Sequence, residues 1–456
     1  MAIKLALIGG GGVRTPLLIH GLAESGVDIS ELALYDADLS RALVMASLGQ
    51  ALTGFPIKPY AQLEQAVEGA SVVLSSIRVG GIAARARDER IAIEHGFAGQ
   101  ETTGPGGAAM ALRTVPVVLE QARVVEKTAP DAWYISFTNP AGLVSQAVAT
   151  HTKLKAIGIC DTPCELFHQI AAALNGPVEC DYAGLNHLGW VRRVTQNGVD
   201  VTKQLLDSDA LLKKLYPVDL FEPDLIRSLE LIPTEYLYFY YAQRRALRNQ
   251  LKAGSTRGAE IEHLNKDLFS ALAQATPKDA LEIYRQYLMR RNASYFKLEA
   301  ESGTAFANYK DQPDPFAAAT GYHRIAVDVL RGLYANSPSE VVVNVPNHGT
   351  IDDLADEDVV EVACHITSSG ATPTHKIGRL PDSVRGLILS VKAYERTLIR
   401  AAVEGSLLLA QRALLEYPIV GEWEPACEVL SALIAEDPDL AYLNPAAHQP
   451  PRWPPS

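Results

Sequence analysis

The sequence predicts an α/β fold, in which a Rossmann-type, doubly wound parallel sheet is followed by a mixed α+β, helix-rich domain. Three observations carry this prediction. Short apolar strands alternate with amphipathic helical stretches as far as Cys160, as a parallel sheet requires. A run of glycines separates the first strand from the first helix, and the alternation changes after Cys160.

Short apolar runs bounded by turn residues mark the strands of the first half. They are expected at 3–9, 31–36, 71–77, 133–138 and 156–160. Helical stretches between them, such as 39–52 and 108–127, repeat apolar residues every three or four positions. This order of elements predicts a doubly wound sheet.

The pattern after Cys160 predicts a different architecture. Residues 178–201 resemble antiparallel strands, with a tight turn at Asn197–Gly198. Further elements are expected in the order helices over 205–291, strands near 341–345 and 359–365, and helices over 382–415 and 424–435. The predicted divisions are a first domain at 1–165, a mixed second domain at 166–445, and a Pro-rich tail at 446–456 that is mobile or straps a neighbouring subunit.

Composition restricts the class of protein. The 456 residues include 48% hydrophobic and 21% charged residues, which is typical of a globular chain with a large core. The 41 Lys and Arg residues stand against 53 Asp and Glu residues, and the net charge of -12 argues against a nucleic-acid or membrane partner. No apolar stretch approaches the roughly 18 residues that a membrane helix needs. The five scattered cysteines indicate a reducing, cytoplasmic setting rather than a disulfide framework.

The first predicted strand runs directly into a glycine-rich turn that precedes a helix. Its residues are Gly9, Gly10, Gly11, Gly12, Val13 and Arg14. Backbone N–H groups and the helix dipole at such a turn hold a pyrophosphate, although Arg14 stands where the usual fingerprint has its third glycine. Asp36 ends the second strand, near the position whose acid binds a ribose hydroxyl. The structural alternatives are a plain turn for the glycines and, for Asp36, a cap on the helix that starts at Leu39.

Polar residues near other predicted strands extend the candidate site. Cys160 in ICDTP ends a strand and His187 lies in GLNHL; a thiolate and an imidazole bind metals, whereas a buried thiol often only fills space. Glu101 lies in GQETTGPGG, whose composition suits either a loop close to a ligand or a flexible turn. Asn139 in FTNPAG follows a strand, where it faces the ligand crevice or caps the next helix.

Taken in order, these segments resemble glycoside hydrolase family 4, the NAD- and metal-dependent glycosidases, and most closely its 6-phospho-β-glucosidases. The matching segments run almost end to end: IGGGG, LYD, RVGGIAARARDE, GQETTGPGG, SFTNPAG, GICDTP, GLNHL, TEYLYFYY, TRGAEIEHLNKDLF, VNVPNHGTI and VKAYERTLI. Several ordered motifs at matching separation are far more specific than any one of them. The family departs from the two-carboxylate scheme of most glycosidases.

The resemblance implies two cofactors. Cys160 and His187 would hold a divalent metal, usually manganese, and the glycine-rich turn with Asp36 would hold NAD. The family's substrate-binding positions, two of which are arginines that contact phosphate, fall on Arg85, Glu101, Asn139, Asn186 and Arg257.

The resemblance also implies a reaction. A 6-phospho-β-glucoside is oxidised by NAD at C3, and the metal makes the C2 proton acidic enough for Tyr236 to remove it. The leaving group departs with a proton from Asp161, and water addition and re-reduction complete the hydrolysis. Without the resemblance, Tyr238, Tyr240 and Tyr241 are equally eligible and a packing role for Tyr236 is favoured.

Two departures bear on the substrate. The β-acting relatives carry a second arginine two residues after the position of Arg257, where this chain has Ala259, and His263 is the nearest candidate to compensate. Asp161 matches the acid of α-acting relatives, whereas many β-acting ones have Asn there. A 6-phospho-α-glucosidase and a hydrolase of unphosphorylated glycosides therefore remain alternatives.

Two other classes of protein compete with a glycosidase. A dehydrogenase of the lactate or malate type would share the cofactor fold, yet it needs no metal thiolate and leaves Cys160, His187 and Tyr236 unused. A non-catalytic NAD-binding sensor would bind the cofactor without turnover. The resemblance also implies a homo-oligomer, either a dimer or a tetramer, that acts on a small phosphorylated glycoside.

Overall fold

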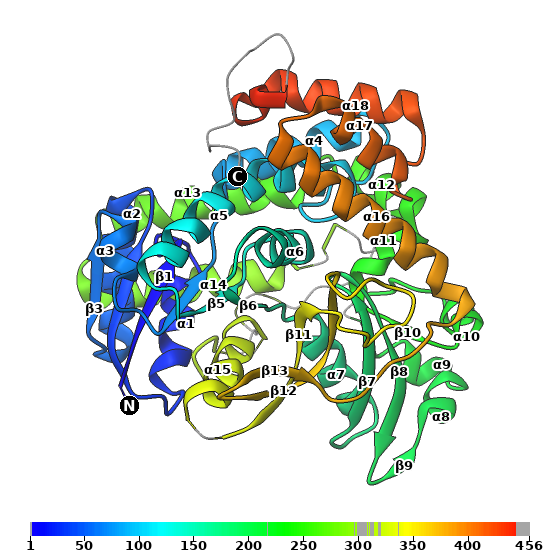
Figure 1. The fold of residues 1–456 in the computed structure, drawn as a ribbon, viewed down its shortest axis with the longest axis horizontal. Coiled ribbons are helices and arrows are strands. Elements are labelled where there is room, and N and C mark those ends of the chain that lie inside the picture. The colour runs from blue at the N-terminus through cyan, green and yellow to red at the C-terminus, as the bar shows by residue number, and fades with distance from the viewer. Residues whose placement is uncertain are drawn as a thin grey trace.

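The computed structural model describes residues 2–216, 218–295, 297–298, 308, 310, 314–317, 321–335 and 337–443. The tail expected at 446–456 lies outside these residues. One 13-stranded sheet runs through the described chain, and helices cover it (Figure 1). Its N-terminal strands are parallel and lie on one side of the molecule, and the strands from later in the chain lie on the other.

Six parallel strands form one end of the sheet. They are β1 (Ile3–Ile8), β2 (Ile29–Tyr35), β3 (Ile57–Tyr60), β4 (Val72–Ser75), β5 (Trp133–Ser136) and β6 (Lys155–Gly158). Their order, β3-β2-β1-β4-β5-β6, is that of a Rossmann-type dinucleotide fold and confirms the predicted fold class. Strand β3 was not predicted, because IKPY is short, contains a proline and is only half-buried.

Seven helices connect and cover these strands. They are α1 (Thr15–Ala23), α2 (Leu39–Thr53), α3 (Leu63–Val67), α4 (Gly81–Glu94), α5 (Gly104–Thr128), α6 (Ala141–His151) and α7 (Thr162–Ala173). Helix α2 starts where it was predicted, but its cap is Asp38, whose Oδ1 accepts from the Arg41 N–H at 3.2 Å. Asp36 is therefore free of the capping role. Helix α5 starts earlier than predicted, so that the GPGG of GQETTGPGG is helical and the loop is shorter than expected.

The sheet continues beyond β6 in the order β11-β12-β7-β8-β10. These strands and the two short ones that pair with them are β7 (Glu179–Leu185), β8 (Leu188–Gln196), β9 (Val199–Asp200), β10 (Ile232–Pro233), β11 (Ser339–Pro346), β12 (Val359–Thr367) and β13 (Gly370–Pro373). The predicted turn joins β8 to β9, with φ of 52° at Asn197 and 77° at Gly198. A second turn, at Asn186 and His187, joins β7 to β8 and was not predicted.

The remaining helices follow β9 in chain order. They are α8 (Thr202–Leu206), α9 (Asp209–Leu212), α10 (Pro223–Leu229), the 3-10 turn η1 (Glu235–Leu237), α11 (Tyr238–Tyr241), α12 (Gln243–Ala253), α13 (Arg257–Leu272), α14 (Pro277–Ala293), α15 (Gly321–Tyr334), α16 (Asp382–Glu404), α17 (Leu407–Glu416), α18 (Trp423–Glu436) and the 3-10 turn η3 (Pro438–Leu443). The single helix predicted over 382–415 is two helices. Gly405, with φ of 67°, ends α16, and Ser406 caps α17.

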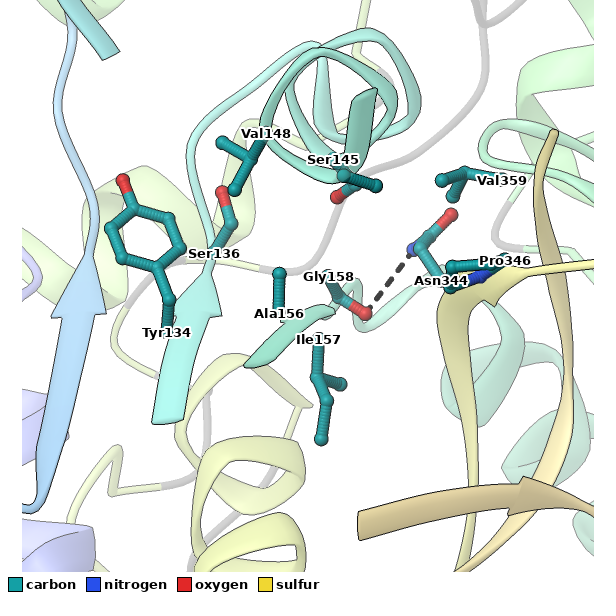
Figure 2. A pocket seen from close by; sticks show the side chains of 11 residues that line it. Tyr134, Ser136, Ser145, Val148, Ala156, Ile157, Gly158, Asn344, Pro346 and Val359 are labelled. Atoms are coloured by element: carbon teal, nitrogen blue, oxygen red, sulfur yellow. Dashed lines mark hydrogen bonds between the residues drawn. The ribbon is translucent and has the colours of Figure 1, made fainter. Parts of the chain in front are cut away.

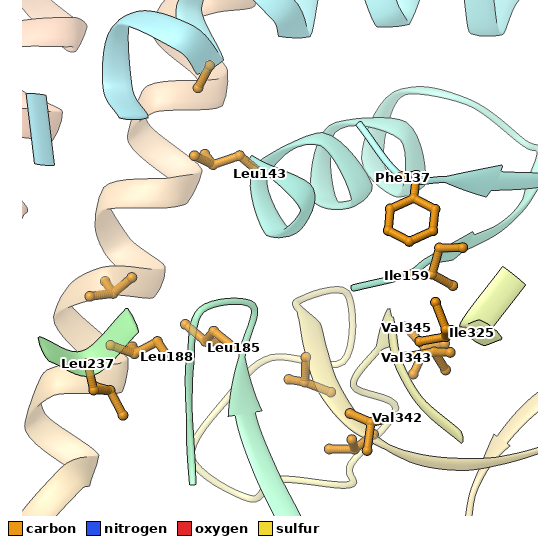
Figure 3. Packing of buried hydrophobic residues seen from close by; sticks show 14 of the residues in the cluster. Phe137, Leu143, Ile159, Leu185, Leu188, Leu237, Ile325, Val342, Val343 and Val345 are labelled. Carbon is orange, nitrogen blue, oxygen red and sulfur yellow. The ribbon is translucent and has the colours of Figure 1, made fainter. Parts of the chain in front are cut away.

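A single apolar core joins the parallel and antiparallel parts. Figure 3 shows Phe137 and Ile159, which follow β5 and β6, close to Val343 and Val345 of β11. The same cluster includes Leu188 of the β7–β8 hairpin. The C-terminal helix α18 packs back onto α4 and α5 of the first half (Figure 1). The two halves of the chain thus hold each other in place.

A small cavity marks the seam where β5 and β6 meet β11. Ser136, Ser145 and Asn344 line it (Figure 2), and the Asn344 Nδ2 donates to the Gly158 carbonyl at 3.5 Å. Its volume of about 10 Å³ is too small for a sugar. The candidate site lies elsewhere, at the carboxyl ends of the parallel strands.

Candidate functional site

The glycine-rich turn after β1 has a backbone that only glycine allows. Gly9 has φ of 92°, and a Cβ there would lie 2.2 Å from the carbonyl oxygen of Ser76. The N–H groups of Gly9 and Gly10 both donate to the Tyr35 carbonyl at 2.9 Å. These contacts fold the turn tightly against the end of β2, at the switch point where such sheets bind dinucleotides.

Asp36 follows β2 and faces this turn. Its Oδ2 accepts from the Gly11 N–H at 2.8 Å, and its Oδ1 accepts from the Asp38 N–H at 2.9 Å. Each carboxylate oxygen has a second acceptor site, so that Asp36 remains able to bind a ribose hydroxyl. A Cβ on Gly11 would meet the Asp36 carboxylate at 2.9 Å, which explains the glycine at this position. Val13 and Arg14 complete the turn before α1.

Cys160 and His187 lie together although 27 residues separate them. The Cys160 Sγ is 3.4 Å from the His187 Nε2, and both side chains are buried, with 6% and 5% of their surfaces exposed. Strand β6 ends at Gly158, so Cys160 stands in the loop just beyond the strand rather than at its last residue. His187 has φ of 60° in the turn between β7 and β8, and this conformation directs its ring toward Cys160.

The second imidazole nitrogen of His187 is fixed by the loop before α5. The His187 Nδ1 lies 2.9 Å from the Thr102 Oγ1, and that hydroxyl donates to the Gln100 Oε1 at 2.9 Å. The Gln100 oxygen also accepts from the Thr103 N–H at 2.8 Å, which assigns it as the carbonyl oxygen of the amide. Because the Thr102 proton points to Gln100, the Nδ1 of His187 donates and its Nε2 carries the lone pair.

This arrangement fits a divalent metal. Burial lowers the pKa of His187 to about 4, so the imidazole is neutral at physiological pH. The Nε2 lone pair and the Cys160 sulfur face each other, and the outer hydrogen bond to Thr102 is of the kind that orients metal-ligating histidines. Within the described ranges no group of three or more His, Cys, Asp or Glu side chains could hold a metal. A metal held by Cys160 and His187 would therefore have open positions for substrate and water.

Tyr236 stacks on the imidazole of His187. The ring centroids are 3.7 Å apart and the planes differ by 4°. Burial, together with the charges of Glu101 and Glu235, raises the pKa of the Tyr236 phenol well above its ordinary value. Of the other tyrosines in this run, Tyr240 is bonded through its hydroxyl to the Tyr417 hydroxyl at 2.9 Å. Tyr236 is the tyrosine of the run that stacks on the metal-fitting histidine.

Asp161 and Asn139 follow β6 and β5. Asp161 precedes α7 without a capping hydrogen bond from its side chain. Burial raises its pKa, although the nearby Arg14 guanidinium opposes the shift. The next helix after Asn139, α6, has Pro140 at its N-cap position, so Asn139 does not cap it. The Asn139 amide forms no hydrogen bond with a described residue, which leaves it open to a ligand.

Asn186 is tied into the protein. Its Nδ2 donates to the Glu361 Oε1 at 3.0 Å and its Oδ1 accepts from the Gly142 N–H at 3.3 Å. Glu361 also accepts from the Tyr182 hydroxyl at 2.7 Å. Burial raises the pKa of Glu361 to about 7. These bonds hold the β7–β8 turn, and with it His187, against α6 and β12.

Glu101 lies between two arginines. Its carboxylate is 2.5 Å from the Arg78 Nη2 and 2.9 Å from the Arg85 Nη1. Burial opposes its ionisation, but Arg78 and Arg85 together outweigh burial and hold its pKa well below the usual range. Arg85 is also bonded through Nε to Glu89 at 2.7 Å, and Glu89 accepts from the Gly258 N–H at 2.6 Å. This chain of contacts joins α4 to the first turn of α13.

Arg257 opens α13 at the end of that chain. It donates to the Arg291 carbonyl at 2.8 Å and to the Ser294 hydroxyl, and it faces Glu260 at 3.4 Å. His263 does not compensate for the missing arginine. Its side chain is 78% exposed and lies 3.6 Å from Asp267, because one turn along α13 carries it to the outer face of the helix.

Sequence reasoning missed four residues that surround the predicted ones. They are Arg78, Gln100, Thr102 and Glu361. The first three lie within the motifs RVGGIAARARDE and GQETTGPGG, but their partners are set by the fold. Glu361 lies in a buried strand, where an isolated acid among apolar residues was the available signal.

Comparison with known proteins shows which family the chain resembles. Residues 4–176 match the model of the family 4 glycosyl hydrolases, and residues 182–420 match the model of the C-terminal domain of the same family. A 6-phospho-beta-glucosidase of Escherichia coli (strain K12) is 32% identical over 92% of this chain and 91% of its own.

Two solved structures extend the comparison. A 6-phospho-beta glucosidase from Thermotoga maritima, with manganese, NAD+ and glucose-6-phosphate, has a TM-score of 0.79 at 29% identity and covers 95% of this chain and 98% of its own. A 6-phospho-alpha-glucosidase from gut microorganisms, in complex with NAD and glucose-6-phosphate, has a TM-score of 0.76 at 25% identity and covers 95% and 97%. No helix in the described part of the chain is long and apolar enough to span a membrane.

Proposed function

Since the chain belongs to family 4 of the glycosyl hydrolases, we propose that it hydrolyses 6-phospho-β-glucosides by transient oxidation at C3 followed by elimination. The observation that carries this proposal is the buried pair of Cys160 and His187, with Tyr236 stacked on the imidazole. A lactate-type dehydrogenase needs neither a metal-binding thiol nor a tyrosine base. A non-catalytic sensor needs no base beside its metal-binding residues. The chain is a glycosidase that uses NAD and a divalent metal.

The cofactor sites follow from the same geometry. Gly9, Gly11 and Gly12 with Asp36 would hold NAD, and Cys160 with His187 would hold manganese or a similar ion. When bound, NAD supplies a hydride acceptor and donor, and the cation supplies a Lewis acid.

Two side chains would move protons. Tyr236 is proposed to take the C2 proton, because its phenol lies against His187 and cannot turn away without breaking the stack. Burial and the charges of Glu101 and Glu235 raise the pKa of the phenol, so the cation that Cys160 and His187 would hold is what would favour the phenolate. Asp161 is proposed to protonate the departing oxygen, and burial, by raising its pKa, helps it to keep that proton.

Phosphate recognition would rest on the arginine cluster. Arg257 lies at the first turn of α13, where a guanidinium and the helix N-terminus act together on an anion. Arg85 is already paired with Glu89 and Glu101. We therefore propose that Arg85 positions Glu101, which contacts the sugar, and that it also contacts the phosphate directly. Asn139, whose amide has no hydrogen-bond partner in the described part of the chain, is proposed to bind a sugar hydroxyl.

The β-anomer is proposed because the relative that shares 32% identity with this chain is a 6-phospho-beta-glucosidase. An α-acting enzyme is the second candidate, favoured by Asp161 and by the shared fold of an α-acting structure. We also propose a cytoplasmic homo-oligomer, dimer or tetramer. The five cysteines are all free in the structure, which suits a reducing compartment.

The deciding experiment is a panel of p-nitrophenyl glucosides, α and β, each with and without the 6-phosphate. Each is assayed with NAD⁺ and Mn²⁺ together, with each alone, and with chelator. The proposal expects turnover of the phosphorylated β-anomer with both cofactors present. Equal turnover of the unphosphorylated glucoside would reject the phosphate assignment, and full turnover in chelator without NAD⁺ would reject the mechanism.

A further inference from the structure

Arg291 lies near the end of α14, a helix that contacts two parts of the candidate site. Its carbonyl accepts from Arg257, in the first turn of α13, at 2.8 Å. Two turns earlier on the same helix, the Tyr284 hydroxyl donates to the Val13 carbonyl in the glycine-rich turn at 2.7 Å. Helix α14 therefore spans from the nucleotide turn to the start of α13, and Arg291 lies at the α13 end of that span.

The Arg291 guanidinium has a neutral partner. Its Nη1 donates to the Tyr287 hydroxyl at 3.0 Å, and that hydroxyl donates onward to the Asn265 Oδ1 at 2.7 Å. Among the described residues no carboxylate forms an ion pair with Arg291. A guanidinium has five N–H donors, so most of those on Arg291 remain for a ligand.

The neighbouring arginines differ in this respect. Arg78 is paired with Glu101, Arg85 with Glu89 and Glu101, and Arg257 with Glu260. A partly buried charge without a counter-ion is unfavourable, and proteins normally pair or neutralise it.

Other positive charges lie close to Arg291. Burial, together with the charges of Arg14 and Arg257, lowers its pKa to about 10, although the Tyr287 contact opposes the shift. The guanidinium of Arg291 is thus subject to the charges of two other arginines, and it also helps to lower the pKa of Glu101. An anion bound among them would relieve this repulsion.

We propose that Arg291 is a phosphate ligand of this site and supplies, next to Arg257, the second guanidinium for the 6-phosphate of the substrate. This inference rests on the proposed function. It also accounts for Ala259, because the second arginine comes from α14 instead of from α13, where the sequence offered the exposed His263. The pyrophosphate of the dinucleotide is the other source of the same chemistry, since α14 also touches Val13.

The test compares Arg291→Gln and Arg291→Lys with the parent enzyme and with Arg290→Gln, which removes the same charge from the adjacent, exposed position. Dissociation constants are measured by calorimetry for glucose 6-phosphate, for glucose and for NAD⁺, each in the presence of Mn²⁺. Melting temperatures verify that each variant is folded.

We expect Arg291→Gln to weaken glucose 6-phosphate binding roughly 10- to 100-fold, the loss of a charge-assisted contact, with Arg291→Lys in between and Arg290→Gln unchanged. Affinity for glucose and NAD⁺ should hold. Weakened NAD⁺ binding with unaltered glucose 6-phosphate binding would assign the guanidinium to the pyrophosphate. Unaltered binding of both would overturn the inference.

The two proposals fail separately. Binding of glucose 6-phosphate needs no turnover, so the role of Arg291 is judged even if the parent hydrolyses no phosphorylated glycoside. Conversely, a parent that hydrolyses 6-phospho-β-glucosides and an Arg291→Gln variant with full affinity would remove the inference and leave the proposed function intact.

Discussion

The imidazole of His187 and the phenol ring of Tyr236 lie parallel, with centroids 3.7 Å apart. One ring belongs to the turn between β7 and β8, and the other to η1, so the stack joins two elements of the second half of the chain. The proposed base and the proposed metal ligand are therefore in direct contact. Effects on proton transfer and on metal binding can still be separated, because each depends on a different atom.

Replacing Tyr236 by Phe keeps the stack and removes the hydroxyl. Turnover should fall by about 100- to 10,000-fold, the usual range for general acid–base catalysis, while Mn²⁺ and NAD⁺ affinities hold. Steady-state kinetics of Tyr236→Phe and of Tyr241→Phe, from the same aromatic run, provide the comparison. In the parent, turnover in deuterium oxide should place deuterium at C2, and a product without it would point to displacement at C1.

Replacing Cys160 by Ser should weaken Mn²⁺ binding strongly, because a hydroxyl is a far poorer anionic ligand than a thiolate. The free Mn²⁺ signal in electron paramagnetic resonance reports the affinity directly. Cys164→Ser is the matched control, since that thiol is also free and lies four residues along the chain. Equal Mn²⁺ affinity in both variants would remove Cys160 from the metal site.

Replacing Thr102 by Val removes the oxygen that accepts from the His187 Nδ1 and keeps the shape of the side chain. Loss of such an outer partner costs about 10- to 100-fold in metal affinity. Thr103→Val should have little effect, because its hydroxyl contacts Gln100 at 3.3 Å and is not bonded to His187. The prediction fails if titration with Mn²⁺ gives the same affinity for both variants.

Replacing Gly9 by Ala should abolish tight NAD⁺ binding and lower the melting temperature. The new Cβ would meet the Ser76 carbonyl at 2.2 Å, in a backbone conformation with φ of 92°. Gly26→Ala separates the two causes, because Gly26 has φ of 73° and open space around it. That control should lose only about 1–2 kcal/mol of stability and retain NAD⁺ affinity in a fluorescence titration.

Glu235 should make stability depend on pH. Burial raises its pKa to about 8 from 4.5, although the Tyr295 hydroxyl bond opposes the shift. The folded protein therefore keeps a proton that the unfolded chain releases, and the free energy of unfolding falls as pH rises between about 4.5 and about 8.

Glu235→Gln lacks this proton equilibrium and keeps an oxygen that can accept from Tyr295. Its stability relative to the parent should rise with pH across that window, by up to about 1.4 kcal/mol per pH unit. Urea unfolding at several pH values measures the difference. Glu222→Gln, at a side chain that is 80% exposed, should show no such trend, and parallel curves for all three proteins would contradict the prediction.

The parallel half of the sheet was predictable because its signals are local. Each strand is a short apolar run and each of these candidate site residues follows one, so the positions of Gly9, Asp36, Asn139 and Cys160 relative to the strands could be predicted from the chain alone. The predicted turn at Asn197–Gly198 was confirmed for the same reason, since two residues encode it.

The other features of the fold and the site depend on contacts between residues that are far apart in the sequence. The turn at Asn186 and His187 contains no glycine, and its Asn186 side chain is bonded to Glu361, 175 residues away. Thr102 meets His187 across 85 residues. Near Arg257 in the sequence, His263 is the nearest candidate for a second cation, whereas the fold brings Arg291 of α14 into contact with Arg257. No local pattern encodes such pairings, because the packing of the whole sheet determines them.

The pairing of β6 with β11 also determines when the sheet can be completed during synthesis of the chain. Gly158 of β6 pairs with Asn344 of β11, which is synthesised 186 residues later. At about 5–20 residues per second, the ribosome needs roughly 10 to 40 s to make that partner, and β6 has an open edge meanwhile. An unpaired strand edge recruits other chains. Newly made copies on one messenger RNA are thus most prone to associate wrongly after β6 has emerged and before β11 has, and chaperone demand should concentrate in that interval.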